Sequence, residues 1–294
     1  RCKNWKSLDY VAGWFMKAAD FATQTQAAAA FVSTNSICQG QQVPILWPQV
    51  FGTGNRITFA HTSFKWANLA SHNAGVTVVI VGLSAQAKTP SRLYSVANSK
   101  GDVVDVKVVD YINAYLIAGA DLVIDKLPIP MGERSEMDAG GKPVDGGNLL
   151  MSVSEKQNLL QSCIGVDDLF KRIYGASEYI RGDVRYCLWL RDVDRNRVES
   201  YPTIKSRFER VAELRLKSPK SSTQRGALWP HKFEEVKQTG SEVITIIPKV
   251  SSESREYLPV GLLPPGSVIT DLAFALYDAP LWNMALIASR LHLV

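Results

Sequence analysis

ITFAHTSFKWANLASHNAGVTVVIVGLS, residues 57–84, contains two strand-like runs joined by a polar and aromatic connection. The second run, residues 76–84, is apolar without alternation, which is typical of a strand covered on both faces. Where strands end, aromatic rings can stack on a planar polar ligand while amides bond its edge. The alternative is that the rings only pack in the core, as aromatic side chains more often do. The connection holds Phe64, Trp66, Asn68, His72 and Asn73.

Segments along nearly the whole chain resemble one protein family in the family's own order. They are residues 7–21 (SLDYVAGWFMKAADF), 30–48 (AFVSTNSICQGQQVPILWP), 60–82 (AHTSFKWANLASHNAGVTVVIVG), 141–150 (GKPVDGGNLL), 185–190 (RYCLWL), 250–261 (VSSESREYLPVG) and 277–294 (YDAPLWNMALIASRLHLV). The family is the adenine-N6 DNA methyltransferases of the MmeI-type restriction–modification enzymes. In these enzymes one polypeptide carries an endonuclease, a methyltransferase and a target-recognition domain.

The resemblance implies an α/β chain in two parts. Residues 1–125 would be the last part of a class I methyltransferase-like mixed sheet, truncated on its N-terminal side. Residues 126–294 would form an α+β target-recognition domain that binds double-stranded DNA. The parent enzyme would use S-adenosylmethionine to methylate adenine N6, and Phe64 would stack on the flipped adenine, with Trp66 as the second choice.

The catalytic motif of such enzymes, Asx-Pro-Pro-aromatic, is absent, because Pro264 and Pro265 are followed by Gly266. In the relatives this motif lies just upstream of the match to residues 1–7. We therefore expect an N-terminal remainder of the same polypeptide to hold the catalytic motif, an endonuclease and the glycine-rich turn that binds S-adenosylmethionine, here called the cofactor turn. A cofactor turn follows the first strand of the domain and opens a helix. The FGTGN turn at residues 51–55 instead lies between a helix and the strand that begins at residue 57, so it does not replace the cofactor turn. This fragment alone is expected to bind no cofactor and to be inactive.

Composition places the chain among globular proteins with room for two domains: 294 residues, of which 46% are hydrophobic. No apolar run reaches the length of about 18 residues that a membrane span needs. The start of the chain has no charged-then-apolar leader, and we expect a bacterial cytoplasmic protein. The four cysteines (Cys2, Cys38, Cys163 and Cys187) lack CxxC spacing, which favours reduced thiols over a metal site.

The first region predicts a helix followed by a buried strand, which is typical of a mostly parallel sheet. Six apolar residues between positions 8 and 19 share one helical stripe, with Ser7 as N-cap, and the strand is expected at residues 27–33. The segment after that strand lies where open α/β sheets bind ligands. Asn35, Gln39 and Gln41 there can bond a base edge or the DNA backbone, or simply face water.

The region after residue 125 begins with a Gly-, Pro- and charge-rich segment, residues 126–148, which is typical of a domain boundary. Its GKPVDGG stretch has two glycines that permit close backbone approach. In this region helices are expected at residues 154–161, 166–174, 203–217 and 279–293, and strands at 185–191, 242–248 and 268–276. Before it, strands are expected at 103–109 and 122–124.

Positive charge is concentrated between residues 171 and 225, which contain 14 Lys or Arg against 7 Asp or Glu, while the whole chain has a net charge of +5. Such a region suits phosphate contact, although a solvated basic surface has the same composition. Residues 203–217 predict a helix with Ile204, Phe208 and Val211 on its apolar stripe, followed by a flexible basic loop at 218–226. The candidate phosphate contacts are Arg207, Arg210, Lys217, Lys220 and Arg225.

Arg255 is the best candidate for a bidentate base or phosphate contact, with an ion pair to Glu253 or Glu256 as the alternative. His231 and His292 are isolated from any HExxH or Asp-His-Ser arrangement, so we expect structural or DNA-facing roles. A stand-alone DNA-binding specificity subunit without catalysis stays open as the second interpretation. A carbohydrate-binding or hydrolytic protein lacks the paired acid and base that it would need.

Overall fold

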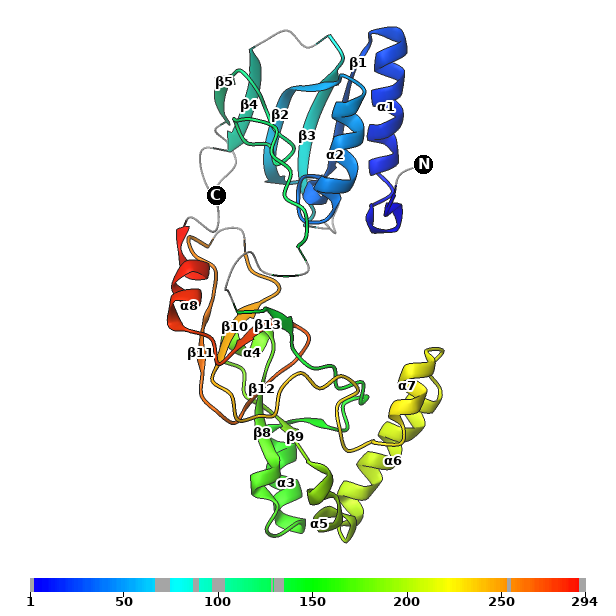
Figure 1. Ribbon diagram of the computed structural model, residues 1–294, viewed down its shortest axis with the longest axis vertical. Coiled ribbons are helices and arrows are strands. Elements are labelled where there is room, and N and C mark those ends of the chain that lie inside the picture. The colour runs from blue at the N-terminus through cyan, green and yellow to red at the C-terminus, as the bar shows by residue number, and fades with distance from the viewer. Residues whose placement is uncertain are drawn as a thin grey trace. The chain divides into compact units, whose positions relative to one another are not determined.

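The computed structural model describes residues 3–66, 75–86, 90–96, 104–127, 129, 135–252 and 255–290. The chain divides into two compact units, Arg1–Pro128 and Ile129–Val294 (Figure 1). Each unit has its own hydrophobic core.

The first unit is a five-stranded sheet with helices packed on it. Its elements are η1 (Trp5–Ser7), α1 (Ala12–Thr25), β1 (Ala28–Thr34), η2 (Asn35–Cys38), α2 (Gln42–Gly52), β2 (Arg56–Lys65), β3 (Thr77–Ser84), β4 (Ser91–Val96) and β5 (Val104–Val109). The strand order is β1-β3-β2-β4-β5. Strand β3 is antiparallel to β1 and β2, β2 is parallel to β4, and β4 is antiparallel to β5. The predicted mixed sheet is confirmed, but the expectation of mostly parallel strands is wrong for this part.

The core of this unit follows from the apolar stripe of the first helix. Helices α1 and α2 lie side by side (Figure 1), and Phe15 and Trp47 are fully buried between them and the sheet. The two rings meet edge to face with centroids 5.9 Å apart. The Trp47 indole also donates to the carbonyl oxygen of Ile37 over 2.8 Å, so its polar atom is satisfied inside the core. Burial of each such side chain contributes roughly 1.5–3 kcal/mol.

Three local expectations for this unit are wrong. Ser7 is not the N-cap of the first helix, because it ends η1 and α1 begins at Ala12. Strand β1 is not buried: only Ser33 among its seven residues is, since β1 forms one edge of the described sheet. No strand forms at residues 122–124, where Leu122 and Ile124 are both more than half exposed.

The second unit contains two four-stranded sheets with helices around them, so the α+β expectation is confirmed. The sheet orders are β11-β10-β13-β6 and β12-β8-β9-β7. The strands are β6 (Asp138–Ala139), β7 (Leu150–Ser152), β8 (Phe170–Tyr174), β9 (Arg185–Leu188), β10 (Ile244–Pro248), β11 (Gly261–Leu263), β12 (Ser267–Ile269) and β13 (Ala273–Tyr277). The helices are α3 (Val153–Ser162), η3 (Asp167–Leu169), α4 (Ala176–Arg181), η4 (Asp192–Asp194), α5 (Arg195–Glu199), α6 (Pro202–Leu216), α7 (Ser221–Gly226) and α8 (Leu281–Ala288).

Helix α3 begins with a capping box. The hydroxyl of Ser152 accepts from the Glu155 backbone N–H over 3.2 Å, and the Glu155 carboxylate accepts from the Ser152 backbone N–H over 2.9 Å. These two bonds satisfy donors that would otherwise be unpaired at the helix start. The predicted helix at residues 154–161 is therefore confirmed, and so is α6 at 203–217 to within a residue at each end.

Three predictions for this unit are wrong. The single strand expected at residues 268–276 is two strands, β12 and β13, which belong to different sheets. Residues 166–174 form the short helix η3 and then strand β8, in which Phe170, Ile173 and Tyr174 are buried. Residues 218–226 are not a loop throughout, because α7 occupies Ser221–Gly226 and packs against α6.

Candidate nucleic-acid interface

Strands β1, β2 and β4 run in the same direction and therefore end at the same end of the first sheet. Strands β1 and β2 both run antiparallel to β3 and are therefore parallel to each other, and β4 is parallel to β2. Asn35 directly follows β1, and Ser63 and Phe64 lie near the end of β2. The Asn35 side-chain amide donates to the Ser63 hydroxyl over 3.4 Å. The fold thus places Asn35 and Phe64, which the sequence analysis selected from segments about 30 residues apart, at the same end of the sheet.

A β-bulge sets the position of Phe64. His61 pairs with Ile80 but Phe64 pairs with Val78, so β2 carries one extra residue between them. Bulges turn a strand and redirect its side chains, and they are frequent beside functional sites. The Phe64 ring has its centroid 4.6 Å from that of His61 and 6.4 Å from that of Trp66.

Neither candidate stacking residue is sealed in the core. Phe64 is half-buried and the Trp66 side chain is 41% exposed. The backbone N–H of Trp66 donates to the carbonyl oxygen of Val76 over 2.8 Å, which closes the ends of β2 and β3. Asn68, His72 and Asn73 of the same connection lie outside the described residues.

A polar cluster that the sequence analysis missed ties the N-terminal segment to the turn after β1. The Asp9 carboxylate accepts from the Ser36 hydroxyl over 2.6 Å and from the Gln42 amide over 2.8 Å. The Asp9 backbone N–H in turn donates to the Gln42 side-chain oxygen over 3.0 Å. The bonds from Ser36 and Gln42 lower the pKa of Asp9, because they stabilise its ionised form. Gln39 and Gln41, the two predicted contacts in this turn, are exposed.

The three candidate phosphate contacts on and directly after α6 divide into two kinds. The Arg207 side chain is only 13% exposed and donates to the Asn148 carbonyl oxygen over 3.0 Å and to the Glu155 carboxylate over 3.2 Å. Its role is therefore to join α6 to the start of α3. Arg210 and Lys217 are exposed, and the structure shows no side-chain bond from either to another described residue.

The basic residues of the α7 region are also exposed. The Lys220 side chain is 61% exposed, with its ammonium 3.7 Å from the Glu234 carboxylate. Arg225, in the last turn of α7, is exposed and makes no side-chain bond to another described residue. Four of the five predicted phosphate contacts of this region thus present their charge to solvent.

Arg215 is the residue that the analysis of α6 missed. It is 1% exposed, and its guanidinium donates only to backbone carbonyl oxygens. Burial lowers the pKa of Arg215. The five bonds go to Val144 (3.0 Å), Gly226 (2.9 Å), Trp229 (3.2 Å), Pro143 (2.7 Å) and Lys232 (2.7 Å). All five N–H donors of the side chain are therefore satisfied, and three separate chain segments meet on one residue.

The GKPVDGG stretch is a tight turn held by Asp145. The buried Asp145 carboxylate accepts from the backbone N–H of Leu149 over 2.6 Å and of Leu150 over 2.9 Å. Gly146 and Gly147 both have left-handed φ angles, +58° and +79°, which residues with a side chain rarely adopt. The turn packs against α6, since a side chain at Gly146 would meet Leu214.

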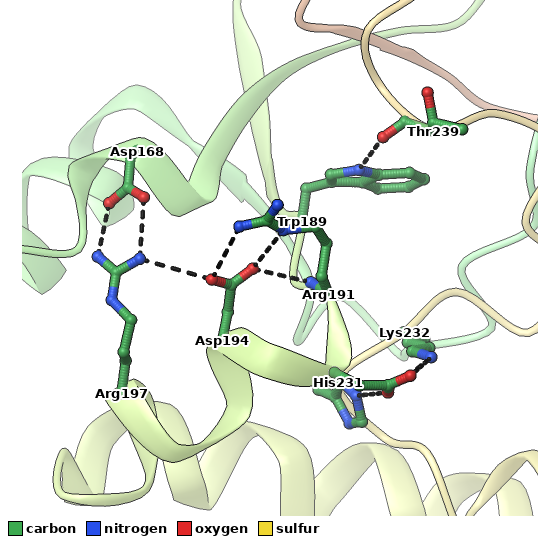
Figure 2. Close-up of polar contacts among 9 residues, drawn as sticks. Asp168, Trp189, Arg191, Asp194, Arg197, His231, Lys232 and Thr239 are labelled. Carbon is green, nitrogen blue, oxygen red and sulfur yellow. Dashed lines mark hydrogen bonds and ion pairs between the residues drawn. The ribbon is translucent and has the colours of Figure 1, made fainter.

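Two cations of the 171–225 region, Arg191 and Arg197, form a network of ion pairs within this unit. Figure 2 shows Arg197 between Asp168 and Asp194, with Arg191 on the other side of Asp194. The Arg197–Asp168 pair is bidentate at 2.9 and 3.0 Å, and the Arg191 guanidinium lies 3.1 Å from Asp194. The bond from Arg191 lowers the pKa of Asp194. The local charge of the sequence thus overstates the charge offered to a ligand.

Beside this network is a cavity of about 410 Å³, lined by Trp189, His231, Lys232 and Phe233 among others. The Trp189 indole donates to the Thr239 carbonyl oxygen over 3.2 Å (Figure 2). The Asp192 carboxylate bonds both His231 and Lys232. His231 is buried and packs edge to face on Phe208. This burial favours the structural one of the two expected roles. His292 lies outside the described residues.

Arg255 is exposed, and the structure shows no side-chain bond from it to another described residue. Glu256, one of the two acids proposed as its ion-pair partner, instead lies 3.5 Å from Arg290. Glu253, the other, lies outside the described residues.

The described part of the chain contains no group of three or more His, Cys, Asp or Glu side chains that could hold a metal ion. It also contains no helix that is both long and apolar enough to cross a membrane. Cys38, Cys163 and Cys187 are buried free thiols.

Two models of known sequence families match the chain. One is described as the MmeI target recognition domain and matches residues 118–294, and the other, the MmeI DNA-methyltransferase domain, matches residues 1–95. The chain belongs to the MmeI family. The resemblance inferred from the seven sequence segments is therefore confirmed.

Two relatives of the MmeI family show how much of such a protein the chain covers. DNA methyltransferase A of Bacillus subtilis (strain 168) is 36% identical over 293 residues, which are 100% of this chain and 32% of that protein. A solved structure of the type IIL restriction–modification enzyme MmeI in complex with DNA matches 99% of this chain and 39% of its own, with a TM-score of 0.90 and 33% identity. The chain therefore spans well under half the length of either relative.

Proposed function

We propose that this chain is the target-recognition part, with the adjoining end of the catalytic domain, of a site-specific DNA methyltransferase that modifies adenine N6 in a bacterial restriction–modification system. The observation that carries the proposal is that the Asn35–Ser63 contact and Phe64 lie at the same end of the first sheet, where the parallel strands β1 and β2 end. Family membership supports methyl transfer to DNA, and the half-buried Phe64 ring and the exposed Trp66 ring support a flipped base as substrate.

In this account Phe64 stacks on the extruded adenine. The exocyclic amine is unreachable inside a duplex, and stacking offsets part of the few kcal/mol that extrusion costs. Trp66, 6.4 Å from Phe64, is the second choice because it is more exposed. Asn35, Gln39 and Gln41 would bond the base edge or the adjacent DNA backbone.

The second unit grips the duplex. Arg210, Lys217, Lys220 and Arg225 would contact phosphates, which position a protein without reading sequence. Arg207, given the same role from the sequence, would contribute only by holding α6 in place, since its guanidinium already bonds Asn148 and Glu155. Arg255, exposed and without an acidic partner among the described residues, would contact a base.

The rest of the same polypeptide would supply the first half of the methyltransferase domain and an endonuclease. The open edge of β1 supports this, because an unpaired strand edge with residues such as Val32 half exposed is usually covered by another strand or helix. The relatives, of which the chain covers about a third, support it as well.

S-adenosylmethionine would be the cofactor of the whole enzyme. The residues described here do not fit it: the Phe51–Asn55 turn joins α2 to β2 and does not open a helix after a strand. We therefore assign no cofactor contact to this chain, and the chain by itself would be inactive. Its buried thiols fit a reducing cytoplasm.

The experiment is methylation-site sequencing of DNA from cells that express the full-length parent, in parallel with cells that express only this chain. Adenine-N6 methylation at one short sequence is expected for the parent and none for the chain alone. Arg255→Ala in the parent should weaken or relax recognition at one position by roughly 1–3 kcal/mol. Methylation of another base, or methylation by the chain alone, would refute the proposal.

The second candidate is a stand-alone specificity subunit that binds DNA without taking part in catalysis. The exposed cations of α6 and α7 favour it equally, since they need only a duplex. The two candidates differ at Phe64: a specificity subunit has no need of it, whereas the methyltransferase does.

A further inference from the structure

The α6–α7 region combines positive charge with exposed apolar side chains. Residues 214–232 contain five Lys or Arg and no Asp or Glu. Within the same stretch Leu216 is 61% exposed, Leu228 is 67% exposed and Trp229 is 50% exposed. Exposed apolar side chains that gather in one patch rimmed by polar residues mark a binding surface.

The turn after α7 sets the direction of these side chains. The backbone N–H of Leu228 donates to the Arg225 carbonyl oxygen and that of Trp229 to the Gly226 carbonyl oxygen, each over 3.1 Å. In such three-residue turns, side chains three positions apart lie above one another. The Leu228 side chain therefore lies above that of Arg225. The next such bond, from the Lys232 N–H to the Trp229 carbonyl oxygen, places the side chains of Trp229 and Lys232 above one another.

The backbone of this turn is fixed from inside the unit. The buried Arg215 guanidinium bonds the carbonyl oxygens of Gly226, Trp229 and Lys232. These three charge-assisted bonds hold the turn in one conformation while its exposed side chains stay in water. A rigid turn with exposed apolar side chains loses little entropy when it binds, which is the property of a preorganised contact.

We propose that Leu228 and Trp229 enter a groove of the DNA and pack against sugar and base surfaces, beside phosphates held by Lys220 and Arg225. This deepens the proposed function and rests on it. Charge complementarity selects the occupant, because Lys217, Lys220 and Arg225 of this stretch are exposed cations and DNA is a polyanion with apolar surface between its phosphates. Such a contact adds affinity at every salt concentration, whereas phosphate contacts weaken as salt rises.

The test measures binding of the complete 294-residue chain to a labelled mixed-sequence duplex by fluorescence polarisation, across a series of salt concentrations. For Leu228→Ala with Trp229→Ala we expect about tenfold weaker binding at each concentration and an unchanged salt slope. For Lys220→Gln with Arg225→Gln we expect a salt slope smaller by about two. Thermal melting of the first variant should match the wild type, because both side chains are exposed.

The matched control is Leu272→Ala with Trp282→Ala, whose side chains are 57% and 47% exposed elsewhere in the same unit. It should bind as the wild type does. Wild-type affinity in the Leu228 and Trp229 variant, or an equal loss in the control, overturns this inference and leaves the proposed function standing. A wild-type chain that binds no DNA at low salt overturns the DNA grip and the inference together.

Discussion

The side-chain amide of Asn35 lies 3.4 Å from the hydroxyl of Ser63, so the turn after β1 contacts the residue that precedes Phe64 at the end of β2. This contact joins two chain segments where β1 and β2 end, and in α/β sheets ligands bind at the carboxyl ends of the strands. The bulge in β2 lies just before Phe64, whose ring centroid is 6.4 Å from that of Trp66. The geometry supports a base-stacking site in which this chain supplies the stacking residue.

Replacing Arg215 is expected to destabilise the second unit strongly. Arg215→Met removes five bonds, a loss of roughly 2–4 kcal/mol, although the Gly226 and Trp229 carbonyl oxygens each still accept a backbone N–H. Arg215→Lys keeps the charge and three of the donors, so it should lie between the wild type and Met. Urea unfolding followed by circular dichroism measures this. Equal stability of all three proteins would show that the five bonds contribute nothing.

The two kinds of cation on α6 should respond differently to substitution. Arg210→Gln with Lys217→Gln should reduce the salt slope of DNA binding by about two and leave the melting temperature unchanged. Arg207→Gln should lower the melting temperature, because Arg207 is buried against Asn148 and Glu155. Salt-dependent binding and thermal melting of each variant provide the comparison. The assignment fails if Arg207→Gln changes only the salt slope.

Acid is expected to weaken the network around Asp194. The pKa of Asp194 is below its ordinary value because Arg191 bonds the carboxylate, and the side chain is only 6% exposed. A carboxyl group with a lowered pKa in the folded state stabilises the fold above its unfolded pKa of about 3.9, and this stability is lost as pH falls through the folded pKa. Asp194→Asn should therefore reduce the melting temperature at pH near 7.

The comparison that isolates Asp194 is the fall in melting temperature between neutral pH and pH about 3. It should be smaller for Asp194→Asn than for the wild type, since the variant has no carboxylate to protonate. Identical falls in the two proteins would assign the acid sensitivity to other carboxylates, such as Asp168 or Glu155, whose pKa values are also lowered by bonds to arginine or to backbone.

Periodicity identified the long elements and failed for the short ones. Helix α6 and the stripe of α1 span several turns, so their period of 3.6 residues is unambiguous. Residues 166–174 hold only a few apolar positions, which fit a helix and a strand equally well, and tertiary packing selected the strand β8. Ser- and Lys-rich residues 218–226 resemble a loop, yet α7 forms there against α6.

Side-chain direction decided which of the candidate site residues stay accessible. The apolar stripe of Ile204, Phe208 and Val211 continues at helical spacing to position 215, so the sequence did contain a signal that Arg215 points inward. Arg207 has no such signal, because its partners Asn148 and Glu155 lie more than 50 residues away in the sequence. The Asp9, Ser36 and Gln42 cluster likewise depends on the turn after β1, which spacing alone does not place.

The most direct test of the account is the effect of Phe64→Ala on methylation by the full-length parent, with Phe64→Tyr as the conservative control. We expect Phe64→Ala to lower the methylation rate at least about tenfold while DNA affinity stays within about threefold, because a stacked base is worth roughly 1–3 kcal/mol. Phe64→Tyr should retain most of the rate. Full methylation by Phe64→Ala would contradict the base-stacking site.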